Sequence, residues 1–75
     1  MSRSPDNALH NALKVRRAIM NLTQAELAQL AGVTRKSINA IEGGRMVPSV
    51  LLALKLARAL KVTVEELFSI DDTLA

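Results

Sequence analysis

Apolar side chains recur every three or four positions along most of this chain. This spacing places them on one face of a helix. No stretch shows the two-residue alternation that is typical of a half-buried strand. We therefore expect an all-α domain whose five helices cover about residues 5–20, 24–31, 35–42, 48–61 and 64–68.

Polar residues mark where several of these helices begin. Ser4-Pro5-Asp6 suits the start of the first helix, because a hydroxyl cap precedes a proline in the first turn. Thr23 and Glu26 have the spacing of a capping box, in which each side chain satisfies a backbone N–H of the other residue. Thr63 and Glu66 have the same spacing before the fifth helix.

A short turn containing Gly32 separates the second and third helices. Glycine readily takes the positive φ that commonly follows a helix, so it permits a sharp corner here. Two helices joined by such a turn form a helix-turn-helix unit. Gly43 and Gly44 are expected to end the third helix.

The third helix is expected to have two different faces. At 100° per residue, Ile38 and Ile41 fall on one face and are expected to be buried. Arg35, Lys36 and Asn39 fall on the opposite face. A helix with cations and an amide on its outer face suits a groove about 12 Å wide, where it can touch base edges.

Basic residues are concentrated in one part of the chain. The net charge is +3 over 75 residues, but residues 14–61 hold nine Lys and Arg against two acids, which is a net charge of +7. Residues 62–75 hold four acids and no base, which is −4. This distribution favours an anionic partner for the basic part. The alternative is that these charges only keep the protein in solution.

Composition argues against several kinds of site. The chain has no cysteine and one histidine, His10, so we expect no disulfide, no metal site and no cofactor. We find no sign of paired carboxylates in a cleft, no nucleophile–base set and no phosphate-loop motif, so we expect no enzyme activity. No apolar run approaches the roughly 18 residues of a membrane span. Because no signal peptide is recognisable either, we expect a cytoplasmic protein without a membrane partner.

Three segments carry a resemblance to a known family: LKVRRAIMNLTQAELAQLAGV, TRKSINAIEGGRMVPS and LARALKVTVEELF. They run from Leu13 to Phe68, and this stretch resembles the Cro/repressor-like, Xre-type helix-turn-helix family. The resemblance implies a lambda-repressor-like DNA-binding domain over residues 9–68. An N-terminal segment, residues 1–8, would precede this domain, and an acidic C-terminal tail, residues 69–75, would follow it.

In this family the third helix lies in the major groove of double-stranded DNA. The resemblance therefore implies base contacts from Arg35, Lys36 and Asn39, with Ser37 and Ala40 beside them. Arg35 is the first candidate, because a guanidinium matches guanine O6 and N7. Lys36 is left open between a base and a phosphate. Asn39 is left open between adenine and a phosphate or water.

The resemblance also implies phosphate contacts from Thr23 and Gln24. Thr23 and Gln24 begin the second helix, where side chains and backbone N–H groups commonly bind phosphate. We expect further phosphate contacts from Gly43, Gly44 and Arg45, because the glycines let the backbone approach a phosphate closely and Arg45 adds charge. The alternatives are that Thr23 only caps its helix and that Arg45 is a solvated residue after an ordinary helix end.

Arg17 and Glu42 match family positions that form an internal salt bridge between the first helix and the end of the third. The resemblance therefore implies a structural role for Arg17 and not a contact with DNA.

The fourth helix has more apolar residues than one buried face uses. The excess predicts self-association through the fourth and fifth helices, with Leu51, Phe68, Ile70 and Leu74 in the interface. The alternative is that the first helix and the tail cover this surface. A homodimer would read inverted half-sites about one helical turn apart.

Two functions remain open on the sequence. The first is a sequence-specific transcriptional regulator, a repressor that binds a pseudo-palindromic operator as a homodimer. The second is a protein-interaction module, an antitoxin-like or adaptor domain whose fourth helix binds an unidentified protein partner. Replacing Arg35 and Lys36 by Ala distinguishes them, because only the regulator depends on these side chains for its ligand.

Overall fold

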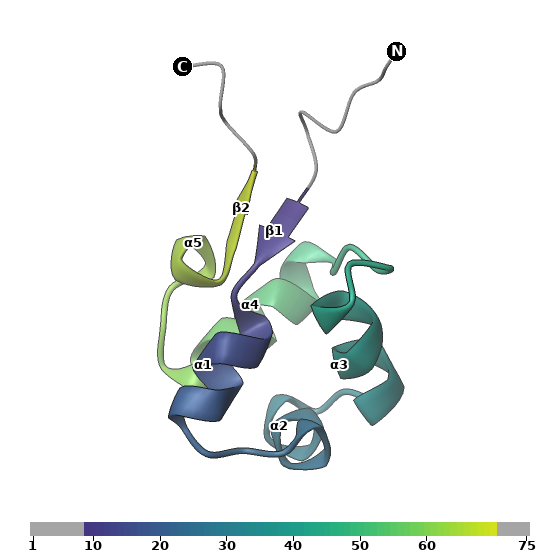
Figure 1. Ribbon diagram of the computed structural model, residues 1–75, viewed down its shortest axis with the longest axis vertical. Coiled ribbons are helices and arrows are strands. Elements are labelled where there is room, and N and C mark those ends of the chain that lie inside the picture. The colour runs from purple at the N-terminus through teal and green to yellow at the C-terminus, as the bar shows by residue number, and fades with distance from the viewer. Residues whose placement is uncertain (1–8, 71–75) are drawn as a thin grey trace.

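A computed structural model describes residues 9–70 of the 75-residue chain (Figure 1). Within this range the elements in chain order are β1 (Leu9–Asn11), α1 (Leu13–Ile19), α2 (Gln24–Ala31), α3 (Arg35–Glu42), α4 (Val50–Leu60), α5 (Val64–Leu67) and β2 (Phe68–Ile70). The five predicted helices are confirmed. The strand pair lies at one end of the long axis and α2 at the other (Figure 1). No helix in the described range has the length and apolar character needed to cross a bilayer.

The expectation that the chain contains no strand is wrong. β1 pairs antiparallel with β2, so that Leu9 lies opposite Ile70 and Asn11 lies opposite Phe68. The first helix therefore begins at Leu13, later than predicted. Its predicted cap at Ser4 lies outside the described residues. Strands of three residues are too short to show a two-residue period. The two strands also lie at opposite ends of the described sequence, so no local pattern reveals that they pair.

Asn11 separates β1 from α1. Its side-chain oxygen accepts a hydrogen bond from the backbone N–H of Leu13 at 3.2 Å, and its Nδ2 donates to the carbonyl oxygen of Ile41 at 3.0 Å. The next N–H, that of Ala12, donates to the carbonyl oxygen of Leu67 at 2.8 Å. These bonds tie the start of α1 to the ends of α3 and α5.

The predicted caps of α2 are confirmed. The Thr23 hydroxyl accepts from the N–H of Glu26 at 3.0 Å, and the Glu26 carboxylate accepts from the N–H of Thr23 at 2.8 Å. Gly32 follows the helix with a φ of 73°, in the left-handed region. The chain therefore turns sharply between α2 and α3, as a helix-turn-helix unit requires.

The start of α4 differs from the prediction. Ser49 is the N-cap, and its hydroxyl accepts from the N–H of Leu52 at 3.1 Å. Pro48 therefore precedes the helix and does not occupy its first turn. The reason is that a serine oxygen satisfies an N–H of the first turn that otherwise has no partner.

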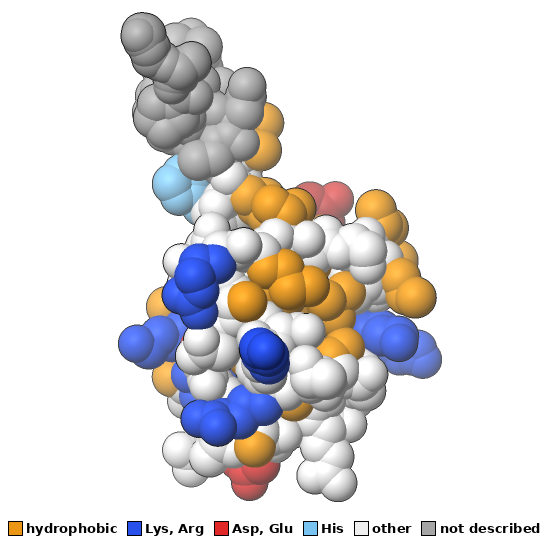
Figure 2. Space-filling view, turned by 90° about the vertical axis from the view of Figure 1, so that its right-hand side faces the viewer, with side chains coloured by type: hydrophobic (Ala, Val, Ile, Leu, Met, Phe, Trp, Pro, Cys, Tyr) orange, Lys and Arg blue, Asp and Glu red, His pale blue; other side chains and the backbone are white. Residues whose placement is uncertain are grey.

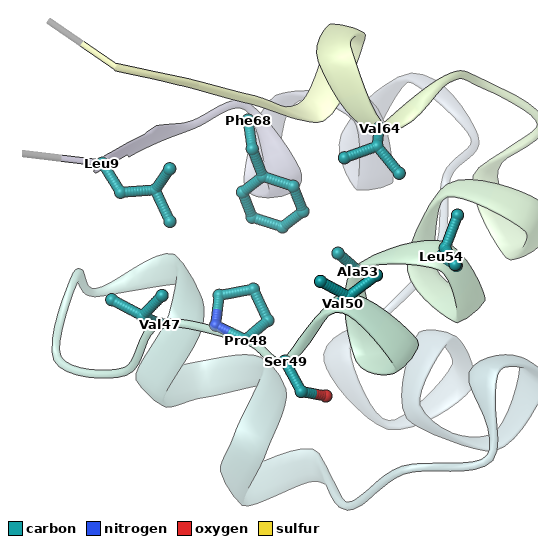
Figure 3. Close-up of a pocket in the computed structure, with 9 residues that line it drawn as sticks. All are labelled: Leu9, Val47, Pro48, Ser49, Val50, Ala53, Leu54, Val64 and Phe68. Atoms are coloured by element: carbon teal, nitrogen blue, oxygen red, sulfur yellow. The ribbon is translucent and has the colours of Figure 1, made fainter.

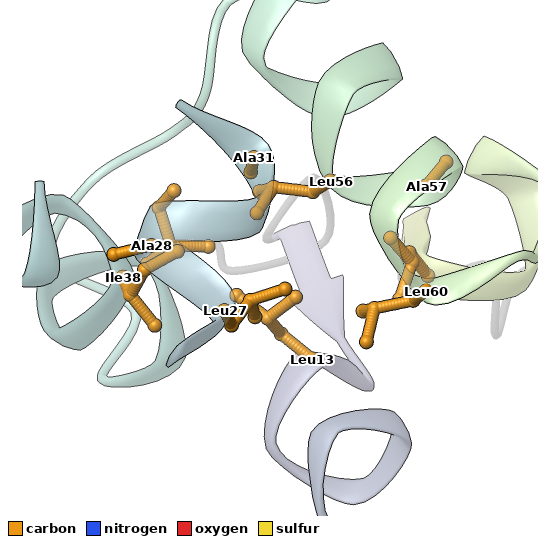
Figure 4. Packing of buried hydrophobic residues seen from close by; sticks show 10 residues of the cluster. Leu13, Leu27, Ala28, Ala31, Ile38, Leu56, Ala57 and Leu60 are labelled. Carbon is orange, nitrogen blue, oxygen red and sulfur yellow. The ribbon is translucent and has the colours of Figure 1, made fainter. Parts of the chain in front are cut away.

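The helices pack around one aliphatic core (Figure 4). All five contribute to its fully buried large side chains, which are Leu13, Leu27, Ile38, Ile41, Leu56 and Leu67. Ala28 and Ala31 of α2 are also buried, and their small size lets neighbouring helices approach closely. Burying one Leu or Ile contributes about 1.5–3 kcal/mol. The two buried isoleucines of α3 therefore fix the rotation of that helix about its axis.

Candidate nucleic-acid interface

α3 turns one face to the core and the other to solvent. Ile38 and Ile41 are 0% and 1% exposed, respectively. Arg35, Lys36 and Asn39 are exposed, and together they line an open hollow of about 270 Å³. The predicted orientation of α3 is therefore confirmed, and its cations and amide are accessible to a ligand.

The surface around α3 is basic. Figure 2 views the side of the molecule on which α3 lies, and several separate Lys and Arg side chains are spread over this face. In this view acidic side chains appear only at the upper and lower margins. A face with this charge distribution attracts a polyanion before any specific contact forms.

Ser37 and Ala40 are half-buried at the margin of the exposed face. The Thr34 hydroxyl accepts from the N–H of Ser37 and donates to the Ser37 hydroxyl, both at 3.0 Å. Thr34 is thus the N-cap of α3, as predicted. The Ser37 hydroxyl already has a partner in this cap, and Ala40 brings only a methyl group.

The two polar residues at the start of α2 have internal partners. Thr23 belongs to the capping box, and Gln24 is half-buried. Nε2 of Gln24 donates to Oε1 of Glu42 at 3.0 Å. This bond links the first turn of α2 to the last turn of α3, and it holds the Gln24 side chain in place.

The loop after α3 contains two glycines that differ in conformation. Gly43 has a φ of −83°, which any residue adopts, whereas Gly44 has a φ of 76°. Nη2 of Arg45 donates to Oδ1 of Asn39 at 2.6 Å. The structure thus joins a residue expected to read a base to one expected to bind phosphate. Sequence reasoning missed this contact; the only available signal was a cation just after the C-terminus of a helix.

Arg17 of α1 and Glu42 of α3 form the ion pair that the family resemblance implies. Nε of Arg17 donates to Oε2 of Glu42 at 2.7 Å, and Nη2 donates to Oε1 at 3.2 Å. Nη1 of Arg17 donates to the carbonyl oxygen of Leu22 at 2.9 Å. All three nitrogens of the guanidinium therefore have partners inside the domain.

The surroundings of Glu42 act on its pKa in opposite directions. Burial tends to raise the pKa, but hydrogen bonds from Arg17 and Gln24, together with the positive charges of Arg17 and Lys14, hold the pKa of Glu42 below its usual value. The hydrogen bond to Glu42 in turn raises the pKa of Arg17. Both groups are therefore charged at neutral pH.

This order of helices, caps and glycines follows one known domain family. Residues 13–67 match the sequence profile of the HTH_3 family, described as helix-turn-helix. The chain belongs to this family. The match includes all five helices of the HTH_3 domain, while β1 precedes it and β2 follows it.

Two similar proteins are named uncharacterized HTH-type transcriptional regulators. One is MJ0272 of Methanocaldococcus jannaschii, which is 45% identical over 64 residues, or 85% of this chain and 97% of the relative. The other is YgzD of Bacillus subtilis, which is 39% identical over 64 residues, with the same shares of both chains.

Two solved structures are similar to this HTH_3 domain. The restriction-modification controller protein C.AhdI from Aeromonas hydrophila has a TM-score of 0.70 and 35% identity, over 72% of this chain and 82% of that one. The c2 repressor of P22, solved in complex with a synthetic operator, has a TM-score of 0.68 and 26% identity, over 71% of this chain and 80% of that one. These likenesses confirm the predicted lambda-repressor-like fold.

The residues predicted to form a dimer interface differ in exposure. Leu51 and Ile70 are 63% and 61% exposed. Phe68 is half-buried and packs against the core, so part of its ring already has an internal partner. Leu74 lies outside the described residues.

The HTH_3 domain also exposes apolar residues that the predicted interface did not include. Val47, Val50 and Leu54 are each more than half exposed. They line an open apolar hollow of about 400 Å³ between the strand pair and the start of α4, into which the ring of Phe68 points (Figure 3). The apolar excess of α4 contained a signal for Val50 and Leu54, but Val47 lies in a loop without periodicity.

Proposed function

We propose that this HTH_3 domain is a transcriptional regulator that binds double-stranded DNA sequence-specifically and acts in the cytoplasm. The observation that carries the proposal is the polar outer face of α3. Two buried isoleucines hold the helix so that Arg35, Lys36 and Asn39 point outward together. An α-helix with such a face fits the major groove, where each base pair presents a distinct pattern of donors and acceptors.

In this proposal each exposed residue of α3 contacts a different base or phosphate of one half-site. Arg35 donates two parallel hydrogen bonds to O6 and N7 of a guanine, a contact that discriminates by about 1–3 kcal/mol. Lys36 adds a flexible charge beside Arg35, directed at a second guanine or at a phosphate. Asn39 contacts the next base along the groove, and Ala40 offers a methyl group for thymine.

Phosphate contacts orient the helix in the groove. Thr23 and Gln24 begin α2, where N–H groups at a helix start favour an anion. The loop after α3, which contains Gly43 and Gly44, brings its backbone close to a phosphate of the other DNA strand, and Arg45 adds a positive charge to this loop. Each phosphate neutralised in this way makes the slope of the logarithm of the binding constant against the logarithm of the salt concentration more negative by about 0.9.

We further propose that the domain acts as a homodimeric repressor on a pseudo-palindromic operator. One recognition helix reads only a few base pairs, and a twofold axis places two helices one helical turn apart. The exposed side chains of Leu51, Leu54 and Ile70 support self-association. A bound dimer represses by occluding a promoter.

The test is a selection of duplexes from a random pool at two salt concentrations. The parent is expected to enrich a pseudo-palindrome that contains guanine, and Arg35→Ala is expected to lose the preference at one position of each half-site. Lys55→Ala is the matched control, since it removes one exposed cation from α4 without touching the face of α3. If the parent enriches no sequence over the starting pool, the proposed function is wrong.

The second candidate is a protein-interaction module, and the apolar hollow beside α4 favours it. In that case an unidentified protein binds α4, and DNA is a secondary ligand or none. The Arg35→Ala/Lys36→Ala double variant distinguishes the candidates. A module keeps its partner after this change, whereas a regulator loses its specific DNA.

A further inference from the structure

Asn39 is held by a neighbour that follows the helix. Nη2 of Arg45 donates to Oδ1 of Asn39 at 2.6 Å and lies 3.4 Å from the carbonyl oxygen of the same residue. The backbone N–H of Arg45 donates to the carbonyl oxygen of Ala40 at 2.9 Å. The guanidinium therefore folds back over the C-terminus of α3, where a cation is favoured by the helix dipole.

Gly43 makes room for this arrangement. Its φ of −83° and ψ of 0° do not require glycine. A Cβ added at Gly43 would overlap Nη1 of Arg45 and lie 3.0 Å from Cζ. At Gly44 a Cβ would meet no atom within 4 Å, but the φ of 76° there favours glycine for the backbone itself. The two glycines thus serve different purposes, and that of Gly43 is to admit the Arg45 side chain.

The contact fixes which end of the Asn39 carboxamide faces outward. A guanidinium has only donors, so the atom that faces Arg45 must be the carboxamide oxygen. The amide nitrogen then lies on the other side, and it makes no hydrogen bond to any residue in the range 9–70. Among the described residues, Asn39 therefore keeps two N–H donors without a partner, while its oxygen accepts from the Arg45 guanidinium.

This orientation matters for the choice of base. An unrestrained asparagine reads adenine by accepting from N6 and donating to N7. With Arg45 in place, the N6 amino group would have to approach the carboxamide oxygen beside the guanidinium. Guanine presents two acceptors, N7 and O6, at the same edge. The donors that Asn39 keeps free match guanine better than adenine.

We propose that Gly43 and Arg45 are positioning residues that make Asn39 select guanine over adenine. The inference rests on the proposed function, because it assigns specificity to a helix that reads DNA. It differs from the expectation that Arg45 only binds phosphate. A phosphate contact changes the affinity for all duplexes alike, whereas a positioning residue changes the preference at one base pair.

The test repeats the duplex selection with Asn39→Ala, Arg45→Ala and Gly43→Ala. All three variants are expected to lose the preference for guanine at one shared position of the half-site, a change of roughly tenfold in relative affinity. In Arg45→Ala and Gly43→Ala the freed carboxamide is expected to accept adenine at that position. The Asn39→Ala variant is expected to show no base preference at that position. The guanine read by Arg35 is expected to stay in all three.

Gly43→Ala keeps the test independent of the charge on Arg45, because the variant retains that charge and displaces only the end of a flexible side chain. The proposal is wrong if Arg45→Ala weakens every duplex equally and keeps the preference at the Asn39 position. A parent that selects no sequence contradicts the proposed function instead, so the two failures are distinguishable.

The free protein gives a second measurement that needs no DNA. Nitrogen-15 relaxation of the Asn39 side-chain amide is expected to report a restrained group in the parent and a mobile one in Arg45→Ala and Gly43→Ala. An Asn39 amide that is equally mobile in all three proteins contradicts the proposal, even if DNA binding is specific.

Discussion

Arg17 and Glu42 are 25 residues apart in the sequence, yet their side chains meet through two hydrogen bonds of 2.7 and 3.2 Å. Their side chains are 16% and 6% exposed. The pair joins α1 to the end of α3, and Gln24 of α2 donates to the same carboxylate. Three helices are thus held together at one acidic side chain.

Arg17→Met is expected to lower the free energy of unfolding by about 2–3 kcal/mol, because it leaves the Glu42 carboxylate without its ion-pair partner. The loss is smaller than for a fully buried pair, since part of Arg17 remains in contact with water. Urea unfolding followed by circular dichroism measures the change. Arg17→Met/Glu42→Met is the control and is expected to regain part of the loss, as no buried charge remains. A single variant as stable as the parent contradicts a structural role for the pair.

The pH dependence of stability is expected to follow Glu42. An unfolded glutamate titrates near pH 4.3. The folded pKa of Glu42 lies lower, so its stabilising effect is complete above that pH and is lost as the pH falls through the folded pKa. The difference in unfolding free energy between the parent and Glu42→Gln is therefore expected to be constant from pH 7 to about pH 5 and to shrink below about pH 4.3. Unfolding curves at several pH values measure it, and an unchanged difference at pH 3 contradicts the assignment.

Gly32→Ala is expected to destabilise the domain by about 1 kcal/mol, because an alanine at a φ of 73° is strained. A Cβ there meets no atom within 4 Å, so the loss arises from the backbone alone. Gly43→Ala is the control: its φ of −83° suits alanine, and its Cβ displaces only the flexible, exposed end of Arg45, so the unfolding midpoint is expected to stay close to that of the parent. Equal effects of the two substitutions contradict this distinction.

Leu51→Glu is expected to shift the protein from dimer to monomer in sedimentation velocity, because it places a charge in the proposed apolar interface. Ile19→Glu is the control: Ile19 is 68% exposed, at the end of α1, and lies outside the hollows beside α4. The interface is misplaced if Leu51→Glu associates as strongly as the parent.

Local signals in the sequence were sufficient for most of the helical framework. Thr23 and Glu26 form their capping box, and Thr34 caps α3, because these bonds join residues three positions apart. The faces of α3 followed from the spacing of Ile38 and Ile41 alone. Such features depend on neighbours in the chain, which a pattern of residues records directly.

The features that the sequence did not predict depend on contacts between distant residues. Asn11 ends β1 through a bond to the carbonyl oxygen of Ile41, and β1 exists only because β2 lies beside it. Arg16, for which the sequence predicts no partner, has its Nη2 3.9 Å from Oε2 of Glu66. The hydrogen bond between Arg45 and Asn39 likewise depends on how the loop folds back over α3. None of these contacts has a fixed spacing along the chain.

The antiparallel register of β1 and β2 also determines how the domain responds to force. Leu9 and Ile70 face each other at the outer end of the strand pair. Tension that draws these two residues apart acts on the cross-strand hydrogen bonds one after another, starting at the outer end, and does not act on all of them at once. The pair is therefore expected to open at a lower force than the helical body, so that tension applied at Leu9 and Ile70 separates the two strands before it unfolds α1 or α5.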